Sequence, residues 1–209
     1  MLRSDALAPR FARAWRGVGA HSTPPDLLDR LLTAWNEPGR HYHSEAHLFD
    51  GLARMDGLRA SLKRPNEVEI AWWFHDAIQV PGAPDNEHRS ADWATEALTA
   101  SRAPEGAIQR IAAAILATRH RGEPATPDEA ALLDLDLAIL GANVAEYDAY
   151  AAGVRAEYAA IPDEAWRAGR AAFLRDMLTH GSMYHTASFH DALELKARAN
   201  LMRELAALD

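Results

Sequence analysis

The chain has 209 residues, 48% hydrophobic and 25% charged, which is enough for one domain with a substantial core and excludes global disorder. The absence of cysteine excludes disulfide bonds and thiolate metal ligands, so a bound metal would have imidazole and carboxylate ligands. A net charge of −8 without a basic block argues against a nucleic-acid polymer as partner, and no apolar run approaches the roughly 18 residues that span a bilayer.

Helical patterns follow one another along the chain, and no stretch alternates with the period of two that strands require. Signals such as Thr23 before Pro24, and Pro65, mark helix starts, and Gly141 marks an end. We expect an all-α, single-domain compact bundle of about nine helices over residues 1–209, with a core from about residue 24 to 180 and flanking terminal helices. In chain order, helices are expected over about residues 5–18, 24–35, 42–60, 65–76, 86–101, 104–120, 127–140, 144–180 in two amphipathic segments, and 189–208.

The stretch over residues 40–76 holds four of the ten histidines. On a helix over residues 42–60, His43 and His47 lie four residues apart and would project from one face, which is a chelating geometry. His75 and Asp76 end an apolar run, where an unpaired polar group costs about 1–3 kcal/mol and a bare charge costs more. A divalent cation would satisfy both side chains at once.

A further acidic candidate lies in the apolar segment LLDLDLAIL. Asp134 and Asp136 are two residues apart on a predicted helix, so at least one of them points inward. Alternatively, these carboxylates cap a neighbouring element or pair with an arginine such as Arg155. The other His-Asp pair, His190 and Asp191, lies where a polar loop enters the last helix, which is typical of capping.

The order His, His-Asp and distant Asp resembles the signature of the HD-domain superfamily of metal-dependent phosphohydrolases. The chain also resembles a bacterial group of predicted HD-superfamily phosphohydrolases in the stretches RHYHSEAH, AWWFHDAI, DNEHRSA, ATRH, LDLDLAILG, YDAYAAGVRAEY and ARANLMREL. The resemblance implies one divalent ion held by His47, His75, Asp76 and Asp136. YHSEAH is similar to the YHNxxH segment of cyclic-nucleotide phosphodiesterases, which implies that His43 protonates the leaving oxygen, although the two residues after it depart from that pattern.

Three further residues each have a catalytic and a structural interpretation. Arg40 would clamp a phosphate with its planar guanidinium, or lie exposed beside a turn. Glu87 would orient the attacking water, or stabilise the first turn of its helix. His120 would contact phosphate, or interact with the C-terminal end of a helix dipole. Two imidazoles and two carboxylates suit Mn²⁺, Fe²⁺, Co²⁺, Ni²⁺ or Zn²⁺ better than Mg²⁺, and we expect one ion rather than two.

The resemblance implies a metal-dependent phosphohydrolase that attacks a small phosphorylated, nucleotide-type substrate with a metal-activated water. The alternatives are a non-catalytic, metal-containing HD module that binds a ligand or regulates a partner, and an HD-type di-iron oxygenase. The charged N-terminus lacks a secretory signal, so we expect a cytoplasmic protein without membrane contact. The amphipathic C-terminal helix is compatible with a homo-oligomer. We expect these aromatic residues in the core rather than in a ligand platform: Trp72, Trp73, Tyr147, Tyr150, Tyr158, Trp166 and Phe173.

Overall fold

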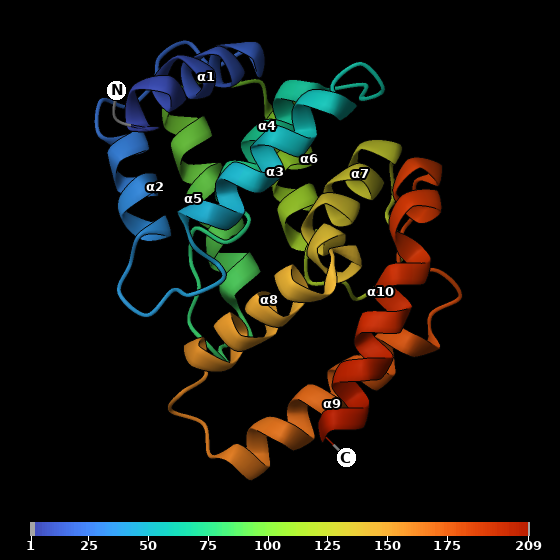
Figure 1. Cartoon of the computed structure of the whole chain (residues 1–209). Coiled ribbons are helices and arrows are strands. Elements are labelled where there is room, and N and C mark those ends of the chain that lie inside the picture. The colour runs from blue at the N-terminus through green and yellow to red at the C-terminus, as the bar shows by residue number, and fades with distance from the viewer. Residues whose placement is uncertain (1–2, 209) are drawn as a thin grey trace.

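The computed structural model describes residues 3–208 (Figure 1); Met1, Leu2 and Asp209, which belong to the expected single-domain range, lie outside the described residues. The described chain is all-helical, as predicted, with ten α-helices where about nine were expected. The elements are α1 (Arg3–Gly17), α2 (Leu27–Trp35), α3 (Glu45–Leu58), α4 (Pro65–Phe74), α5 (Asn86–Ala100), α6 (Glu105–Ala117), α7 (Pro127–Asp136), the 3₁₀ helix η1 (Leu137–Gly141), α8 (Val144–Glu157), α9 (Asp163–Thr179) and α10 (Ala187–Leu208). None of these described helices is both long enough and apolar enough to cross a membrane.

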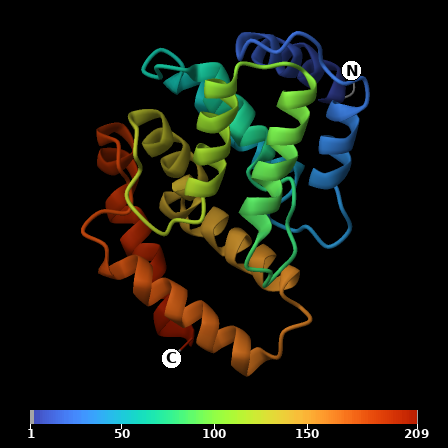
Figure 2. The ribbon, with the colours of Figure 1, turned by 180° about the vertical axis from the view of Figure 1, so that it is seen from behind.

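Helix α4 occupies the centre of the fold (Figures 1 and 2). Every residue over positions 68–74 is buried, and the helix contacts α1, α3, α5, α6 and α7. A helix that is apolar all round has to be covered on every side, which explains this position. Because α4 ends at Phe74, the two polar residues that follow, His75 and Asp76, lie in the middle of the molecule.

Glu69 is the charged exception on the buried surface of α4. Its fully buried carboxylate pairs with Arg10 and Arg13 of α1 and with Arg59, the residue after α3. An unpaired carboxylate at this depth would be strongly destabilising, so the three guanidinium groups are needed to compensate its charge. This cluster joins α1 and α3 to the central helix.

Helices α9 and α10 form one end of the molecule; in Figure 1, α9 lies along the lower edge and α10 runs up the right-hand side. Helix α10 packs against α9 and η1, and α8 packs against η1. Asp134 of α7 binds the segment just before α10. Its buried carboxylate accepts hydrogen bonds from the backbone N–H groups of His185 and Thr186, at 2.8 Å each. Asp134 therefore has the predicted capping role, and its partners among residues 3–208 include no arginine.

Several helix boundaries differ from the sequence-based prediction by a few residues, among them two beside the candidate site. Helix α3 begins at Glu45 rather than near residue 42, because Ser44 has an extended backbone and the preceding residues bind another helix. His43 and His47 therefore do not project from one helical face, and that part of the prediction is wrong. The helix predicted up to Leu140 tightens into a 3₁₀ helix after Asp136.

Candidate metal centre

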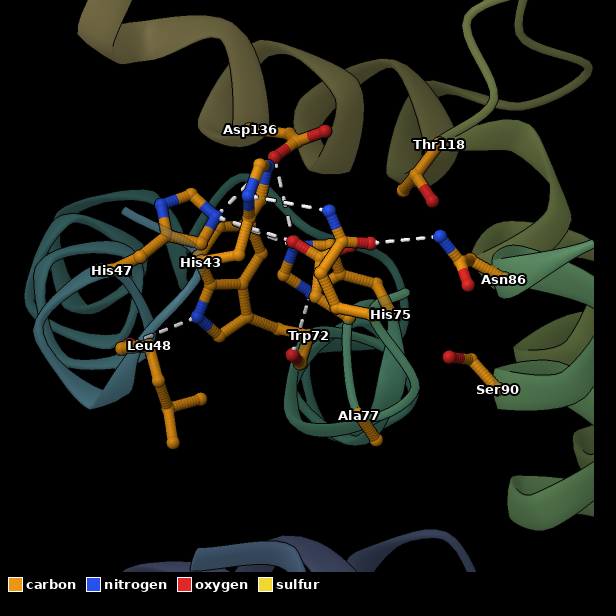
Figure 3. Close-up of polar contacts among 12 residues, drawn as sticks. His43, His47, Leu48, Trp72, His75, Ala77, Asn86, Ser90, Thr118 and Asp136 are labelled. Atoms are coloured by element: carbon orange, nitrogen blue, oxygen red, sulfur yellow. Dashed lines mark hydrogen bonds and ion pairs between the residues drawn. The ribbon is translucent and has the colours of Figure 1, made fainter. Parts of the chain in front are cut away.

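Four side chains from three separate segments of the chain meet at one point (Figure 3). His47 lies in the first turn of α3, His75 and Asp76 directly follow α4, and Asp136 is the last residue of α7. Each offers one ligand atom, and the four atoms lie within 4.8 Å of one another. This His/Asp cluster can hold a metal ion.

The separations within the cluster fit a common ion. The Nε2 atom of His47 lies 3.4 Å from Nε2 of His75 and 3.4 Å from Oδ1 of Asp136. The Nε2 atom of His75 lies 3.2 Å from Oδ2 of Asp76 and 3.5 Å from Oδ1 of Asp136. Ligand atoms at about 2.1 Å from one ion are separated from each other by roughly 3.0–3.4 Å. The four pairs above lie close to this spacing, whereas Nε2 of His47 lies 3.9 Å from Oδ2 of Asp76. The donor set matches the imidazole and carboxylate ligands that divalent transition metals prefer.

Trp72 fixes the orientation of the His75 ring. The indole stacks on this imidazole with 4.3 Å between ring centroids, and its Nε1–H donates to the carbonyl oxygen of Leu48 at 3.0 Å. The Nδ1 atom of His75 lies 2.8 Å from the carbonyl oxygen of Trp72 and donates its hydrogen to it, which leaves the Nε2 lone pair for an ion. Gly51 of α3 makes room for the indole, because a Cβ there would lie 1.9 Å from Cζ2 of Trp72.

Charge attraction holds the cluster together when no ion is bound. Burial alone would lower the pKa of His75, but the carboxylates of Asp76 and Asp136 raise it to about 10. Burial opposes ionisation of Asp76, yet the neighbouring His75 lowers the pKa of this carboxyl group to about 2. The pKa of Asp136 is also held well below its ordinary value, by His120, His47 and His75 against the effect of burial. A metal ion that binds here displaces the proton of His75.

His120 positions the carboxylate of Asp136. It follows α6 and has a left-handed backbone conformation, with φ of +51°, which is uncommon for a residue other than glycine. Its Nε2 atom lies 2.8 Å from Oδ2 of Asp136, whereas Oδ1 faces His47 and His75. Residues are held in such conformations mainly at functional sites. His120 lines the same cavity as the cluster, so contact with a bound phosphate is also open to it.

His43 is oriented by Glu157, the last residue of α8. One carboxylate oxygen of Glu157 accepts the backbone N–H groups of His41, Tyr42 and His43 at 2.7–2.9 Å, and the other lies 2.6 Å from Nδ1 of His43. Burial alone would lower the pKa of His43, but the hydrogen bond to Glu157 raises it overall. The sequence did not indicate Glu157, because this residue lies 114 positions after His43 and no local pattern distinguishes it from other acidic residues in helices.

Arg40 does not line the cavity beside the cluster. Its guanidinium donates to the carbonyl oxygens of His43 (3.1 Å), Asp76 (2.6 Å) and Ala77 (3.0 Å), and to Glu37. All three nitrogens are engaged and the side chain is only 4% exposed. The predicted phosphate clamp is therefore wrong for this structure, because no donor is free to turn toward a substrate. Arg40 instead joins the segment before α3 to the end of α4.

A cavity of about 600 Å³ opens beside the cluster. Asp76, Asp136, His43 and His120 all contribute to its wall, so an ion in the cluster would be accessible from it. Glu87, in the first turn of α5, also lines this cavity, and its carboxylate has no hydrogen-bond or ion-pair partner among residues 3–208. The hydroxyl group of Tyr42, which also lines the cavity, is buried without a hydrogen-bond partner in the described part of the chain. The carboxylate of Glu87 is therefore available to water or to a ligand.

The loop before α5 forms part of the cavity rim. Asn86 accepts the backbone N–H of Val80 and donates to the side-chain oxygen of Gln79, at 3.0 Å each, and Ser90 accepts the N–H of Ile78 at 3.1 Å. Figure 3 shows Asn86 and Ser90 projecting from α5 toward this loop. Gln79 of this loop lines the cavity as well.

The aromatic residues divide into two groups. Trp72, Trp73 and Tyr147 are fully buried and Tyr150 nearly so, as predicted for a core. Tyr150 also lines the cavity, as do the remaining three residues, which are less buried: Tyr158, Trp166 and Phe173, the last of them 39% exposed. Their helical spacing resembles that of core residues, but α9 has few neighbours on this side, so the expectation of a core position is wrong for Phe173.

Comparison of the chain with protein-family models, with curated proteins and with solved structures finds no match. The interpretation of the site therefore depends on its own residues. They offer a buried set of nitrogen and oxygen ligands, a carboxylate-oriented imidazole and a cavity large enough for a small molecule.

Proposed function

We propose that the protein is a metal-dependent phosphohydrolase of the HD-domain type, which hydrolyses a small phosphate ester at the His/Asp cluster. The observation that carries the proposal is the convergence of His47, His75, Asp76 and Asp136 within 4.8 Å, with the two aspartates on the wall of a cavity of about 600 Å³. Of the known uses of two imidazoles and two carboxylates beside an open cavity, activation of water for hydrolysis needs the fewest additional groups.

When bound, a divalent ion supplies Lewis acidity, which lowers the pKa of water and polarises a phosphoryl oxygen. The residues that would hold it are His47, His75, Asp76 and Asp136, with the ring of His75 fixed by its Nδ1 hydrogen bond. This donor set suits Mn²⁺, Fe²⁺, Co²⁺, Ni²⁺ or Zn²⁺ better than Mg²⁺.

Two residues of the chain move protons in the proposed reaction. Glu87, whose carboxylate is unpaired in the cavity, accepts a proton from the attacking water as the new P–O bond forms. His43 gives the proton on Nε2 to the leaving oxygen as the old P–O bond breaks. Glu157 keeps Nδ1 of His43 as a hydrogen-bond donor, so the proton available for transfer is the one on Nε2. The products are inorganic or monoesterified phosphate and an alcohol.

A screen with added metals tests the proposal. Purified protein is assayed with each of Mn²⁺, Co²⁺, Ni²⁺, Zn²⁺ and Mg²⁺ against a chromogenic phosphomonoester, a chromogenic phosphodiester and mononucleotides. We expect turnover that Asp76→Asn and Asp136→Asn abolish. Asp191→Asn, in the other His-Asp pair and exposed on α10, is the matched control and retains turnover.

The same screen can contradict the proposal. Rates that stay at the level of the uncatalysed reaction with every metal would reject the hydrolase. If a chelator then also lowered the unfolding temperature, the result would favour a non-catalytic module in which the ion is structural. Turnover that survives Asp136→Asn would show that catalysis occurs elsewhere or in a contaminant.

A further inference from the structure

The cavity beside the cluster also indicates what kind of substrate enters it. We infer that the substrate carries a single phosphoryl group on a flat, apolar organic group, and that this group lies between α8 and α9 while the phosphoryl group lies at the cluster. The inference rests on the proposed phosphohydrolase function and adds the chemical class of its substrate.

The first argument is the division of the cavity wall into a polar and an apolar part. Asp76 and Asp136 of the cluster, together with His43 and His120, lie in the polar part. Much of the apolar part comes from α8, α9 and the loop between them, with Val154, Tyr158, Ile161, Trp166 and Phe173, and the 3₁₀ helix η1 adds Leu137, Ile139 and Leu140. A ligand that fills such a cavity needs a charged end and an apolar end.

The second argument concerns the aromatic residues in the apolar part. The rings of Tyr158 and Trp166 lie 5.2 Å apart at 43°, and the guanidinium of Arg155 lies 5.4 Å from the Trp166 ring. The side chains of Ile161 and Phe173 remain 37% and 39% exposed. Large apolar side chains that stay uncovered around a concave surface gain free energy when a flat apolar group covers them.

The third argument is the small amount of uncompensated positive charge. Arg170 lines the cavity, but its guanidinium is bound to Glu204 at 2.7 and 3.0 Å and lies 3.2 Å from the hydroxyl of Tyr150. Arg119 is different: it lines the cavity, and its guanidinium has no ion-pair or hydrogen-bond partner among residues 3–208. The carboxylates of Asp76 and Asp136 already balance the charge of a divalent ion, and the carboxylate of Glu87 opposes Arg119, so the site has no surplus positive charge for more than one phosphoryl group. Each further phosphate would enter without compensating charge, which is costly.

The size of the cavity agrees with this class of ligand. A volume of about 600 Å³ falls within the range of pockets that bury a small organic molecule. It leaves room for a ring system beside the phosphoryl group. The organic part is therefore expected to contribute to affinity through apolar contact rather than through charge.

Gly169 of α9 allows a test that does not disturb the fold. It lines the cavity, and a Cβ at this position would meet no atom within 4 Å. Gly169→Leu therefore adds a side chain at the cavity whose Cβ meets no neighbour, and it also replaces a residue of poor helix propensity. Gly57→Leu on α3 is the matched control, because Gly57 is equally free of neighbours but does not line the cavity.

The experiment measures binding of non-hydrolysable probes to the Mn²⁺-loaded protein by calorimetry. The probes are phenylphosphonate, methylphosphonate and methylenediphosphonate. We expect phenylphosphonate to bind about tenfold or more tighter than methylphosphonate, since burial of a phenyl ring contributes that much. Gly169→Leu and Trp166→Ala should remove this preference, whereas Gly57→Leu should keep it. Arg119→Gln should weaken both monophosphonates, whereas Arg121→Gln, at an exposed arginine outside the cavity, should not.

Three results would overturn the inference: equal affinity for the two monophosphonates, tighter binding of the diphosphonate than of either, or an unchanged preference in both Gly169→Leu and Trp166→Ala. Absence of any phosphonate binding to protein that does bind Mn²⁺ would overturn it as well. Turnover of phenyl phosphate is measured separately. If phenylphosphonate binds with the expected preference but phenyl phosphate is not hydrolysed, the proposed function fails and the binding site stands.

Discussion

Replacement of Glu157 by glutamine tests how the segment before α3 is held. One oxygen of Glu157 accepts three backbone N–H groups, and an amide oxygen can replace it there. The other oxygen, 2.6 Å from Nδ1 of His43, becomes an amide nitrogen and loses its charge. A hydrogen bond between charged groups contributes about 1.5–3 kcal/mol. Solvent screens this one little, because the two side chains are only 21% and 1% exposed. We expect Glu157→Gln to lower the free energy of unfolding by about 2 kcal/mol near pH 6.

The size of this effect depends on pH in a defined direction. The pKa of His43 is raised above its ordinary value of 6.5, so the contribution of its charge is complete below that value and is lost as pH rises through the folded-state pKa. The pKa of Glu157 is lowered below 4.5, by His43 and backbone N–H groups against the effect of burial, so its contribution is lost at acid pH. The pair therefore stabilises the fold most between about pH 4.5 and 6.5.

Urea unfolding of chelator-treated protein at about pH 6 and about pH 9 measures the difference. Wild type and Glu157→Gln should differ more at the lower pH. Glu146→Gln, at an exposed acid on the same helix, should match wild type within about 0.5 kcal/mol at both. An equal loss of stability at the two pH values would refute the ion pair between Glu157 and His43.

Three further predictions follow from buried groups around the site. Glu69→Ala should lower the free energy of unfolding, measured by urea titration, by about 3–5 kcal/mol, because it leaves three guanidinium groups without their buried partner. Asp56→Ala, at the exposed end of the same cluster, should lower it by less than about 1 kcal/mol. Gly51→Ala should cost roughly 1–3 kcal/mol and weaken metal binding, because its Cβ displaces Trp72 from the ring of His75. Metal binding at about pH 8 should release close to one proton, since the pKa of His75 is about 10 without an ion; calorimetry in buffers of different ionisation enthalpy measures this.

Each of these has a contrary outcome. Equal stability losses for Glu69→Ala and Asp56→Ala would mean that the buried charges are not compensated as the distances indicate. A Gly51→Ala protein with wild-type stability and metal affinity would mean that Trp72 does not fix His75. Binding enthalpies that do not vary with the buffer would mean that His75 is already neutral.

The helices were predictable because their signals are local. Pro65 and Pro127 stand at the first positions of α4 and α7, and the apolar character of residues 70–74 indicates burial. The start of α3 was not predictable. The backbone N–H groups of residues 41–43 could lie within a helix or donate to a carboxylate far along the chain. No nearby residue indicates that they donate to Glu157.

The candidate site could be predicted in part, because one of its signals is also local. A His-Asp pair at the end of a buried helix needs a partner wherever the chain folds, which sequence alone indicates. The choice between the two aspartates of α7 needed coordinates: Asp134 binds the start of α10, and Asp136 joins the cluster. The sequence could not identify Arg119 as a candidate phosphate ligand, because its lack of a partner among residues 3–208 is visible only in the structure. Likewise, the sequence does not show that Arg40 donates to the carbonyl oxygens of Asp76 and Ala77.

Metal titration of the chelator-treated protein tests the central claim most directly. Calorimetry with Mn²⁺, followed by elemental analysis of the dialysed complex, should give one ion per chain. His47→Gln and Asp136→Asn should each abolish tight binding, whereas Asp191→Asn should leave it unchanged. No bound ion at any loading, or one ion per chain that persists in both His47→Gln and Asp136→Asn, would contradict a metal centre formed by these four side chains.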